Sequence, residues 1–524
     1  MASIVINRTL KSLLEQRALK TPEAPFLIFD DLSGGVESLS YSEFDIRVNH
    51  ASHVLTALGI GVGDTFNVHL RNQPEFLYLW FAAAKTGAVM MPTNVLSSVA
   101  ELEYLIAHSA SRVIFTDREH VQAMREVASR CDGVNRIILC DSSLDDEGND
   151  EVLLSLMAGQ DDGPPAHVPQ GSDRVGILYT SGTTARPKGV MVTNSNYIYA
   201  GETVAKAIAM SALDRHLVVM PLFHGNAQYY STMSTLVSGA SMVLMGRFSA
   251  SAYFDQAITH GCTVSSLFAA PIRMLLAQDE RAELIKNQLR VVLFAQNVSE
   301  SQLSEWQRRF DVRLLQLWGM TETMGPPLMN PLFEQGDNMS MGRPVMGYEI
   351  KLVDAQGSEV PQGDVGQIIV RGIVGETLMA GYLDNPEASA QTVRDGWLWS
   401  GDNARLDADG FFRFVDREKD MIKRSGENVA TSEVEAVIAQ HPDVFECAVI
   451  GVPDAIRDEA IKAVVVLKAE SQRSGEVVDA EAIIAWCAQR LATFRVPSLV
   501  EFRTDLPRTS VGKVQKHLLR ESKS

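Results

Sequence analysis

The first third of the chain alternates helical patterns of apolar residues with short apolar runs. Between Tyr41 and Asp117 the spacing of apolar residues predicts a helix over 42–58, an apolar helix around 76–84 and a strand over 112–116. Such alternation is typical of a parallel sheet covered by helices. Further runs have the length of buried parallel strands, and we expect such strands at 175–179, 217–220, 241–245 and 291–294.

The pattern changes after Gly342. Apolar residues alternate with polar ones over 349–354, 366–372 and 411–416, and stretches rich in Gly, Pro and Asp separate these runs. Hairpins and an antiparallel barrel or sheet are therefore expected. The C-terminal stretch is mixed, with helices predicted at 432–440 and 479–491 and strands at 447–451 and 463–467.

These patterns predict α/β and α+β architecture in two domains. The N-terminal domain is expected to span 1–416, with parallel-rich, helix-covered subdomains at 1–174 and 175–340 and a small antiparallel barrel at 341–416. A small, mobile α+β domain is expected at 417–524. A chain of 524 residues is too long for one core, so the division also fits the length.

The composition of the chain argues against several classes of partner and site. The chain has 65 acidic and 47 basic residues, a net charge of -18, and no basic stripe, so we expect no nucleic-acid partner. The five cysteines are scattered without a CxxC pair, which argues against a disulfide framework or a zinc site. No apolar run reaches the length of a membrane span, and the N-terminus lacks a signal-peptide core. We therefore expect a cytoplasmic protein without a membrane span.

A run of small and hydroxylated residues follows the predicted strand that ends at Tyr179. It reads TSGTTARPKG over 180–189. Its glycines let backbone N–H groups approach an anion, its hydroxyl groups add donors, and Lys188 supplies a positive charge. A Ser/Thr-rich turn is the alternative interpretation. The preceding strand and the density of donors favour phosphate binding, although the Walker pattern GxxxxGK[ST] is absent.

Further motifs follow in a fixed order. They are WGMTET at 318–323, GWLWSGD at 396–402, DREKD at 416–420, GEN at 426–428, and PRT at 507–509 with GK at 512–513. Together with TSGTTARPKG, these runs resemble the AMP-forming acyl-CoA synthetase superfamily over nearly the whole chain. The most similar subgroup is the crotonobetaine and carnitine CoA ligases, judged from 320–323, 422–424 and 456–463.

The resemblance implies an enzyme that joins a carboxylic acid to CoA in two steps. The acid's carboxylate first attacks the α-phosphorus of ATP, which gives acyl-AMP and pyrophosphate; the CoA thiol then displaces AMP. The expected cofactors are ATP, Mg²⁺ and coenzyme A, and the expected small-molecule partner is the acid or its acyl-adenylate. The acid itself is not fixed by the fold. The oligomeric state stays open, with a homodimer as one alternative.

The resemblance also implies roles for individual residues. Glu322 is the expected Mg²⁺ ligand, because a carboxylate suits this hard cation. Lys513 is expected to reach the reacting carboxylate and the bridging oxygen during adenylation, and Lys419 is the expected hinge of the small domain. The expected catalytic residues are Thr180, Lys188, His224, Glu322 and Lys513. The expected cofactor-binding residues are Thr180, Ser181, Gly182, Thr183, Thr184, Lys188, Gln296, Asn297, Trp318, Gly319, Met320, Thr321, Asp402, Arg417, Gly426 and Glu427.

Two further sites follow from the same resemblance. Asp402 is expected to accept hydrogen bonds from both ribose hydroxyls, Arg417 to donate to the same sugar or to the phosphate, and 425–426 to line the tunnel of the thiol. The acyl pocket is expected to contain His224, Asn226, Gln296, Trp318, Met324 and Gly325. A structural histidine is the alternative interpretation of His224.

Some positions depart from the family pattern. Trp318 replaces the usual Tyr near the adenine, and Gln296 stands in a stretch where small residues are usual. Ser425 replaces a common Gly, and Arg495 replaces a Lys. Added bulk near the adenine would weaken ATP binding. We therefore keep three alternatives to the full ligase: an enzyme that only transfers a supplied acyl-adenylate to CoA, a silent adenylate-binding protein, and transfer to a carrier protein.

Overall fold

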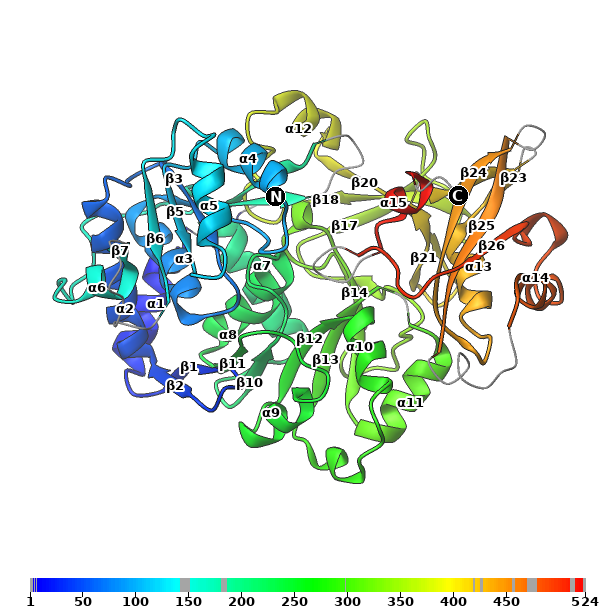
Figure 1. Cartoon of the computed structure of the whole chain (residues 1–524), viewed down its shortest axis with the longest axis horizontal. Coiled ribbons are helices and arrows are strands. Elements are labelled where there is room, and N and C mark those ends of the chain that lie inside the picture. Colours follow the sequence, from blue (N-terminus) through cyan, green and yellow to red (C-terminus); the bar gives the residue numbers. More distant parts are fainter. Residues whose placement is uncertain are drawn as a thin grey trace.

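The computed structural model places a larger N-terminal part beside a smaller C-terminal part, which is orange and red in Figure 1. It describes residues 3, 5, 7–141, 151–180, 186–296, 298–417, 420–424, 427–454, 458–468, 478–508 and 514–521. For Arg417, Lys423, Glu427, Asn428, Asp458 and Glu521 it describes the backbone alone.

The first sheet of the N-terminal part is mostly parallel. In spatial order its strands are β7 (Glu151–Val152), β6 (Arg136–Leu139), β5 (Val113–Thr116), β3 (Thr65–His69), β4 (Val89–Pro92), β8 (Arg174–Thr180) and β9 (Lys188–Thr193). Only the β8–β9 pair among these described strands is antiparallel. The helices along this stretch of the chain are α2 (Tyr41–Ala57), α3 (Pro74–Thr86), α4 (Val99–His108), α5 (Val121–Ala128) and α6 (Leu153–Met157).

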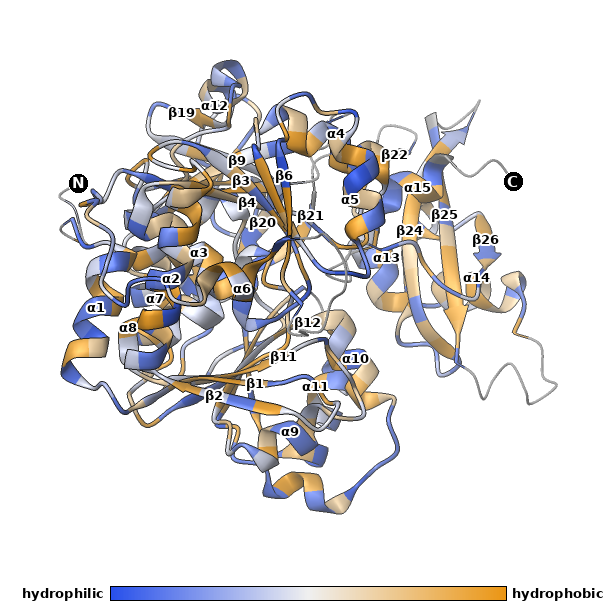
Figure 2. Cartoon of the chain, turned by 60° about the vertical axis from the view of Figure 1, so that its left-hand side comes forward, coloured by the Kyte–Doolittle hydropathy of each residue, from blue (hydrophilic) through white to orange (hydrophobic). Residues whose placement is uncertain are grey.

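The second sheet has a parallel centre and antiparallel edges. Its strands are, in order, β16 (Arg343–Pro344), β15 (Leu328–Met329), β14 (Arg313–Trp318), β13 (Val291–Ala295), β12 (Val264–Phe268), β10 (Arg215–Val218), β11 (Ser241–Met245), β1 (Pro25–Asp30) and β2 (Val36–Ser40). Figure 2 shows central strands of this sheet such as β11 largely orange, as expected of buried apolar runs. Neighbouring helices are α1 (Leu10–Lys20), α7 (Asn194–Ala207), α8 (Met233–Ser238), α9 (Tyr253–Thr259), α10 (Ala269–Leu276) and α11 (Glu300–Phe310).

The two sheets exchange strands across the expected subdomain boundary at residue 174. β1 pairs with β11 in the second sheet, whereas β8 and β9 complete the first sheet beside β4. The division into 1–174 and 175–340 therefore does not separate the two sheets. Local hydrophobic patterns predict strands but not which distant strand each one pairs with, and this is the physical reason for the difference.

The region after Gly342 forms the antiparallel sheet that its alternating pattern predicts. β17 (Glu349–Val353) pairs with β18 (Val365–Arg371), which pairs with β20 (Trp397–Leu406). β19 (Val393–Arg394) and β21 (Phe412–Arg417) also pair with β20. A short helix, α12 (Pro386–Thr392), precedes β19.

The C-terminal part has hydrophobic clusters of its own. Its sheet contains β23 (Glu427–Val429), β22 (Ile422–Arg424), β25 (Asp458–Leu467), β24 (Val444–Asp454) and β26 (Leu499–Phe502), with helices α13 (Thr431–Ile438), α14 (Ala480–Ala488) and α15 (Lys516–Glu521). The α+β character expected there is confirmed. The domain boundary at 416/417 stays a prediction.

Two expectations drawn from composition can be compared with the fold. All five cysteines are free thiols, in agreement with the absence of a disulfide framework. None of the helices in the described part of the chain combines the length and the apolar character needed to cross a bilayer.

Candidate active site

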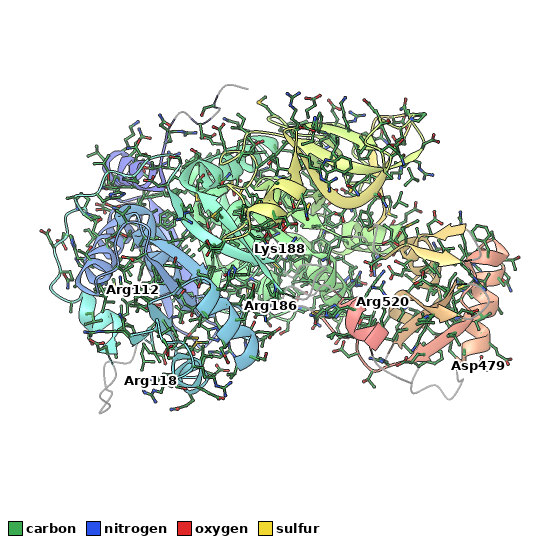
Figure 3. All side chains as sticks on the ribbon, turned by 90° about the horizontal axis from the view of Figure 1, so that it is seen from above. Arg112, Arg118, Arg186, Lys188, Asp479 and Arg520 are labelled. Carbon is green, nitrogen blue, oxygen red and sulfur yellow. The ribbon has the colours of Figure 1, made fainter. Side chains whose placement is uncertain are left out.

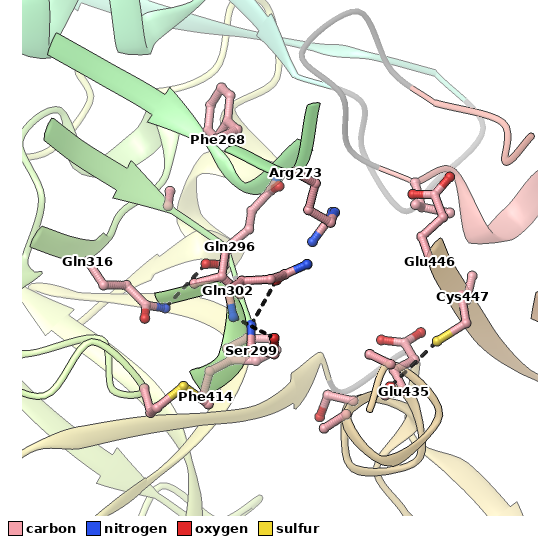
Figure 4. Close-up of a pocket in the computed structure, with 18 of the residues that line it drawn as sticks. Phe268, Arg273, Gln296, Ser299, Gln302, Gln316, Phe414, Glu435, Glu446 and Cys447 are labelled. Atoms are coloured by element: carbon pink, nitrogen blue, oxygen red, sulfur yellow. Dashed lines mark hydrogen bonds between the residues drawn. The ribbon is translucent and has the colours of Figure 1, made fainter. Parts of the chain in front are cut away.

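A cavity of about 1900 Å³ lies between the second sheet and the C-terminal part. β12, β13 and β14 end at it, and ligands of open α/β sheets bind beyond the carboxyl ends of such strands. In Figure 4, Gln296 and Arg273 lie on one side of the cavity, and Glu435 and Cys447 lie on the other. The cavity brings together eight of the residues expected from the sequence, namely His224, Asn226, Gln296, Trp318, Gly319, Met320, Thr321 and Asp402.

A π-helix over Asn226–Thr232 forms one wall of the cavity. π-Helical turns are rare and frequently occur at functional sites. The backbone N–H of Asn226 donates to Nδ1 of His224 at 3.1 Å, so a neutral His224 carries its proton on Nε2. The His224 ring also packs edge-on against Phe268, with centroids 5.5 Å apart.

Two buried oxygen atoms of this π-helix have no hydrogen-bond partner among the described residues. They are Oδ1 of Asn226 and Oη of Tyr229, and both residues line the cavity. The Asn226 side chain is held in place because its Nδ2 donates to Oγ of Ser266 at 2.9 Å. Burial raises the pKa of Tyr229, so its hydroxyl keeps its proton. A buried polar atom without a partner costs about 1–3 kcal/mol, so a ligand that supplies the partner gains this energy.

Trp318 and Asp402 meet at the same cavity from two different sheets. The indole N–H of Trp318 donates to Oδ2 of Asp402 at 2.9 Å, and both side chains are buried. Asp402 lies directly opposite Arg417 on the paired strands β20 and β21. The two residues expected to contact the sugar are therefore neighbours in the sheet.

Backbone strain occurs at two of the expected pocket residues. Gln296 has φ = 79°, and Met324 has φ = 57° and ψ = -86°. A non-glycine residue in such a region costs about 1–3 kcal/mol, and such strain clusters at functional sites. Gln296 lines the cavity, whereas Met324 and Gly325 are not among the described residues that line it. Their role in the acyl pocket stays a prediction.

The strands that flank the expected phosphate loop bring Thr180 and Lys188 together. These residues are opposite each other at the ends of β8 and β9. Lys188 lies near the middle of the larger part in Figure 3, close to Arg186. Its Nζ is 4.9 Å from the centroid of the Tyr382 ring, a cation–π geometry.

The expected metal ligand, Glu322, is buried in a 3₁₀ turn over Thr321–Thr323. Its Oε1 accepts a hydrogen bond from Oη of Tyr382 at 2.9 Å. Among the described residues, no hydrogen bond to Oε2 is found. Thr321, the preceding residue, lines the cavity.

The wall that the C-terminal part contributes is charged. Lys516 Nζ lies 2.8 Å from Oε1 of Glu435 and donates to Oγ1 of Thr431 at 2.6 Å. Burial would lower the pKa of Lys516, but the Glu435 carboxylate beside it raises that pKa overall. Burial lowers the pKa of Arg273, which faces this wall from α10.

Several residues expected in the site cannot be placed. Ser181, Gly182, Thr183, Thr184, Asn297, Lys419, Gly426 and Lys513 lie outside the described residues, and the side chains of Arg417 and Glu427 do as well. Conversely, sequence reasoning missed aromatic residues of the site, namely Tyr229, Tyr230, Phe268 and Tyr382. Tyr229 and Tyr230 lie within six residues of His224, which the sequence already placed in the acyl pocket, and this proximity was the available signal. Tyr382 has no such signal, because Glu322 is far from it in sequence.

Comparison with known families decides what this arrangement is. The family model described as AMP-binding enzyme matches residues 14–383, and the model described as AMP-binding enzyme C-terminal domain matches residues 433–513. The chain belongs to the AMP-binding enzyme family. It is an acyl-CoA ligase of the adenylate-forming type, with ATP and CoA as substrates.

Relatives and solved structures agree with this assignment. The crotonobetaine/carnitine–CoA ligase of Proteus mirabilis is 38% identical over 497 residues, which cover 94% of this chain and 95% of the relative. The Salmonella typhimurium protein of the same name is 36% identical and covers 99% of this chain and 100% of its own. The anthranilate CoA ligase AuaEII in complex with anthranoyl-AMP has a TM-score of 0.89 at 25% identity, covering 100% of this chain and 99% of its own. ATP-bound MatB from Rhodopseudomonas palustris also has a TM-score of 0.89, at 27% identity and 99% coverage of both chains.

Proposed function

We propose that this ligase acts on a small carboxylic acid that carries a cationic or hydrogen-bond-donating group beyond its carboxylate. The observation that carries the proposal is a pair of buried oxygens in the cavity wall, Asn226 Oδ1 and Tyr229 Oη, which have no hydrogen-bond partner in the part of the chain that the structure describes. An acid with a donor group would satisfy the Asn226 oxygen, whereas a purely alkyl acid would leave it without a partner.

Aromatic side chains add a second reason. Tyr229, Tyr230, Phe268 and Trp318 line the same cavity. Their ring faces attract a cation, and aromatic surroundings are the usual way to bind quaternary ammonium groups. Curated relatives with 36–38% identity carry crotonobetaine and carnitine in their names, and a betaine combines a carboxylate with an ammonium group.

Magnesium would be held at Glu322. Oε2 of Glu322, which accepts no hydrogen bond from any described residue, and the Thr321 hydroxyl are hard oxygen donors, which suit Mg²⁺. Among the described residues no group of three His, Cys, Asp or Glu side chains could hold a metal, so the phosphates of ATP and water would provide the other ligands. Bound there, the ion would supply charge neutralisation on the phosphates.

The remaining site residues would act in one or the other of the two half-reactions, adenylation and transfer to CoA. Lys188 would contact the phosphates from the start of β9, and Asp402 would bind the ribose. Lys513 would reach the reacting carboxylate and the bridging oxygen in the first step. A swing of the C-terminal domain about Lys419 would then bring 425–426 to the thiol for the second step. A cytoplasmic location and a homodimer remain part of the proposal.

An acid panel tests the proposal. The enzyme is incubated with ATP, Mg²⁺, CoA and acids of matched length that carry a quaternary ammonium, an ammonium, a hydroxyl or only an alkyl chain. Acid-dependent release of AMP and pyrophosphate should be highest, as kcat/KM, for an acid with a cationic or donor group. A preference for the alkyl acid would refute the substrate class. If supplied acyl-AMP reacts with CoA but no acid reacts in the presence of ATP and CoA, the enzyme only transfers a preformed acyl group from the adenylate to CoA.

A further inference from the structure

The segment 379–383 connects the two parts of the site that handle phosphate charge. The backbone N–H of Met379 donates to the carbonyl oxygen of Glu322 at 2.9 Å. Four residues later, the N–H of Leu383 donates to the carbonyl oxygen of Gly189, next to Lys188 at the end of the phosphate loop, at 2.8 Å. The main chain of this segment thus joins the turn of the expected metal ligand to the phosphate-loop strand.

The side chain of Tyr382 also connects Glu322 with Lys188, through its hydroxyl and its ring. Its hydroxyl donates to Oε1 of Glu322 at 2.9 Å, and its ring lies 4.9 Å from Nζ of Lys188. The tyrosine is only 6% exposed. Its own backbone N–H donates to Oγ of Ser389 at 2.8 Å, and this bond ties it to α12. Tyr382 is therefore anchored independently of the two groups that it contacts.

We propose that Tyr382 is a positioning residue that orients the Glu322 carboxylate and supports the Lys188 ammonium for the adenylation step. The inference rests on the proposed function, in which Glu322 holds magnesium and Lys188 contacts the phosphates of ATP. It adds to that function a residue that touches neither the acid nor CoA.

The physical reason is different for each contact. A carboxylate can rotate, and a hydrogen bond to Oε1 fixes which oxygen remains for the metal. Outer-shell hydrogen bonds of this kind typically change metal affinity 10- to 100-fold when they are removed. The ring face attracts the Lys188 ammonium and limits its rotamers, which is worth about 0.5–1 kcal/mol, a two- to fivefold change in affinity.

Two substitutions separate these contributions. Tyr382→Phe removes the hydroxyl and keeps the ring, whereas Tyr382→Leu removes both. Binding of Mn²⁺ to the enzyme–ATP complex, followed by electron paramagnetic resonance, should weaken about tenfold in both variants. ATP binding in EDTA, followed by calorimetry, should be unchanged in Tyr382→Phe and about two- to fivefold weaker in Tyr382→Leu. Conversion of supplied acyl-AMP and CoA to acyl-CoA should keep its wild-type rate in Tyr382→Phe.

Tyr348→Phe is the matched control. This buried hydroxyl donates to the carbonyl oxygen of Thr323, in the same turn as Glu322 but not to its carboxylate. The control should bind Mn²⁺ and ATP as the wild type does. Equal weakening in both Phe variants, or unchanged Mn²⁺ affinity in Tyr382→Phe, would overturn the inference. Because the metal and ATP measurements need no acid, they stay interpretable even if every acid in the panel fails.

Discussion

Trp318 donates its indole N–H to Oδ2 of Asp402 at 2.9 Å, from β14 of one sheet to β20 of another. Both side chains are buried, at 7% and 6% exposure. A tyrosine at position 318 has no indole N–H to make this bond. One oxygen of the Asp402 carboxylate, which we propose to bind the ribose, therefore already accepts a hydrogen bond from Trp318 before nucleotide is present.

Trp318→Phe tests this arrangement, because it keeps an aromatic ring and removes the N–H. Without nucleotide the variant should be destabilised by about 1–3 kcal/mol, since the buried Asp402 carboxylate loses one of its hydrogen bonds. Bound ATP should restore part of this loss, because a ribose hydroxyl can donate to the same oxygen. Thermal unfolding with and without ATP should therefore show a larger ATP-induced rise in Tm for the variant than for the wild type. An equal or smaller rise would contradict the ribose role of Asp402.

Asn226→Ala tests the acyl pocket. The substitution removes the unpartnered Oδ1, so kcat/KM for the preferred acid should fall about 10- to 100-fold, whereas kcat/KM for an alkyl acid of the same length should change less than threefold. Steady-state pyrophosphate release measures both values. Ser266→Ala is the control, since it keeps Oδ1 of Asn226 and removes only the acceptor of its Nδ2. An equal fall of kcat/KM for both acids would show that Asn226 supports the structure of the cavity wall and does not contact the substrate.

Lys513→Ala tests the division of labour between the half-reactions. Lys513 lies outside the described residues, so the expectation rests on the family motif. Acid-dependent pyrophosphate release should fall at least about 10²-fold, because a fixed cation at the developing charge is lost. Conversion of supplied acyl-AMP and CoA should stay within about threefold of the wild type. Lys516→Ala, three residues further on, provides a comparison in which we expect both half-reactions to suffer, because Glu435 loses its buried partner.

Local sequence patterns predicted a number of the helices and strands but not how the sheets assemble. The apolar run at 241–245 coincides with β11, and the predicted helix at 42–58 corresponds to α2 at Tyr41–Ala57. Pairing of β1 with β11 was not predictable, because the two strands are far apart in sequence and their apolar runs contain no information about a partner.

The candidate site shows the same limit. Motif residues such as Trp318 and Asp402 could be identified because each lies in a recognisable run, and the structure brings them into contact. Tyr382 could not be identified, because its role depends on a hydrogen bond to Glu322 across two separate segments. The positive φ of Gln296 was equally hidden, since nothing in its side chain indicates a left-handed backbone.

His216 offers a test of stability away from the site. It lies in β10 between the apolar neighbours Met242 and Val264, and neither ring nitrogen has a hydrogen-bond partner among the described residues. Burial lowers its pKa to about 3. In the unfolded chain a histidine has a pKa of about 6.5, so between these values the unfolded state binds a proton that the folded state does not. Stability should therefore fall as the pH falls from about 6.5 towards 3, by up to about 1.4 kcal/mol per pH unit from this residue.

Replacing the ring should remove that dependence. His216→Leu should raise the free energy of unfolding at pH 7 by about 1 kcal/mol, because an unpartnered buried polar group is lost. Its slope against pH, measured by urea denaturation between about pH 6 and 4, should become shallower by the contribution of one proton. Burial also lowers the pKa of His69 to about 3, so part of the slope should remain. His517→Gln, at an exposed position, should leave both quantities unchanged. A less stable His216→Leu protein with an unchanged slope would mean that the folded protein provides a partner for the His216 ring.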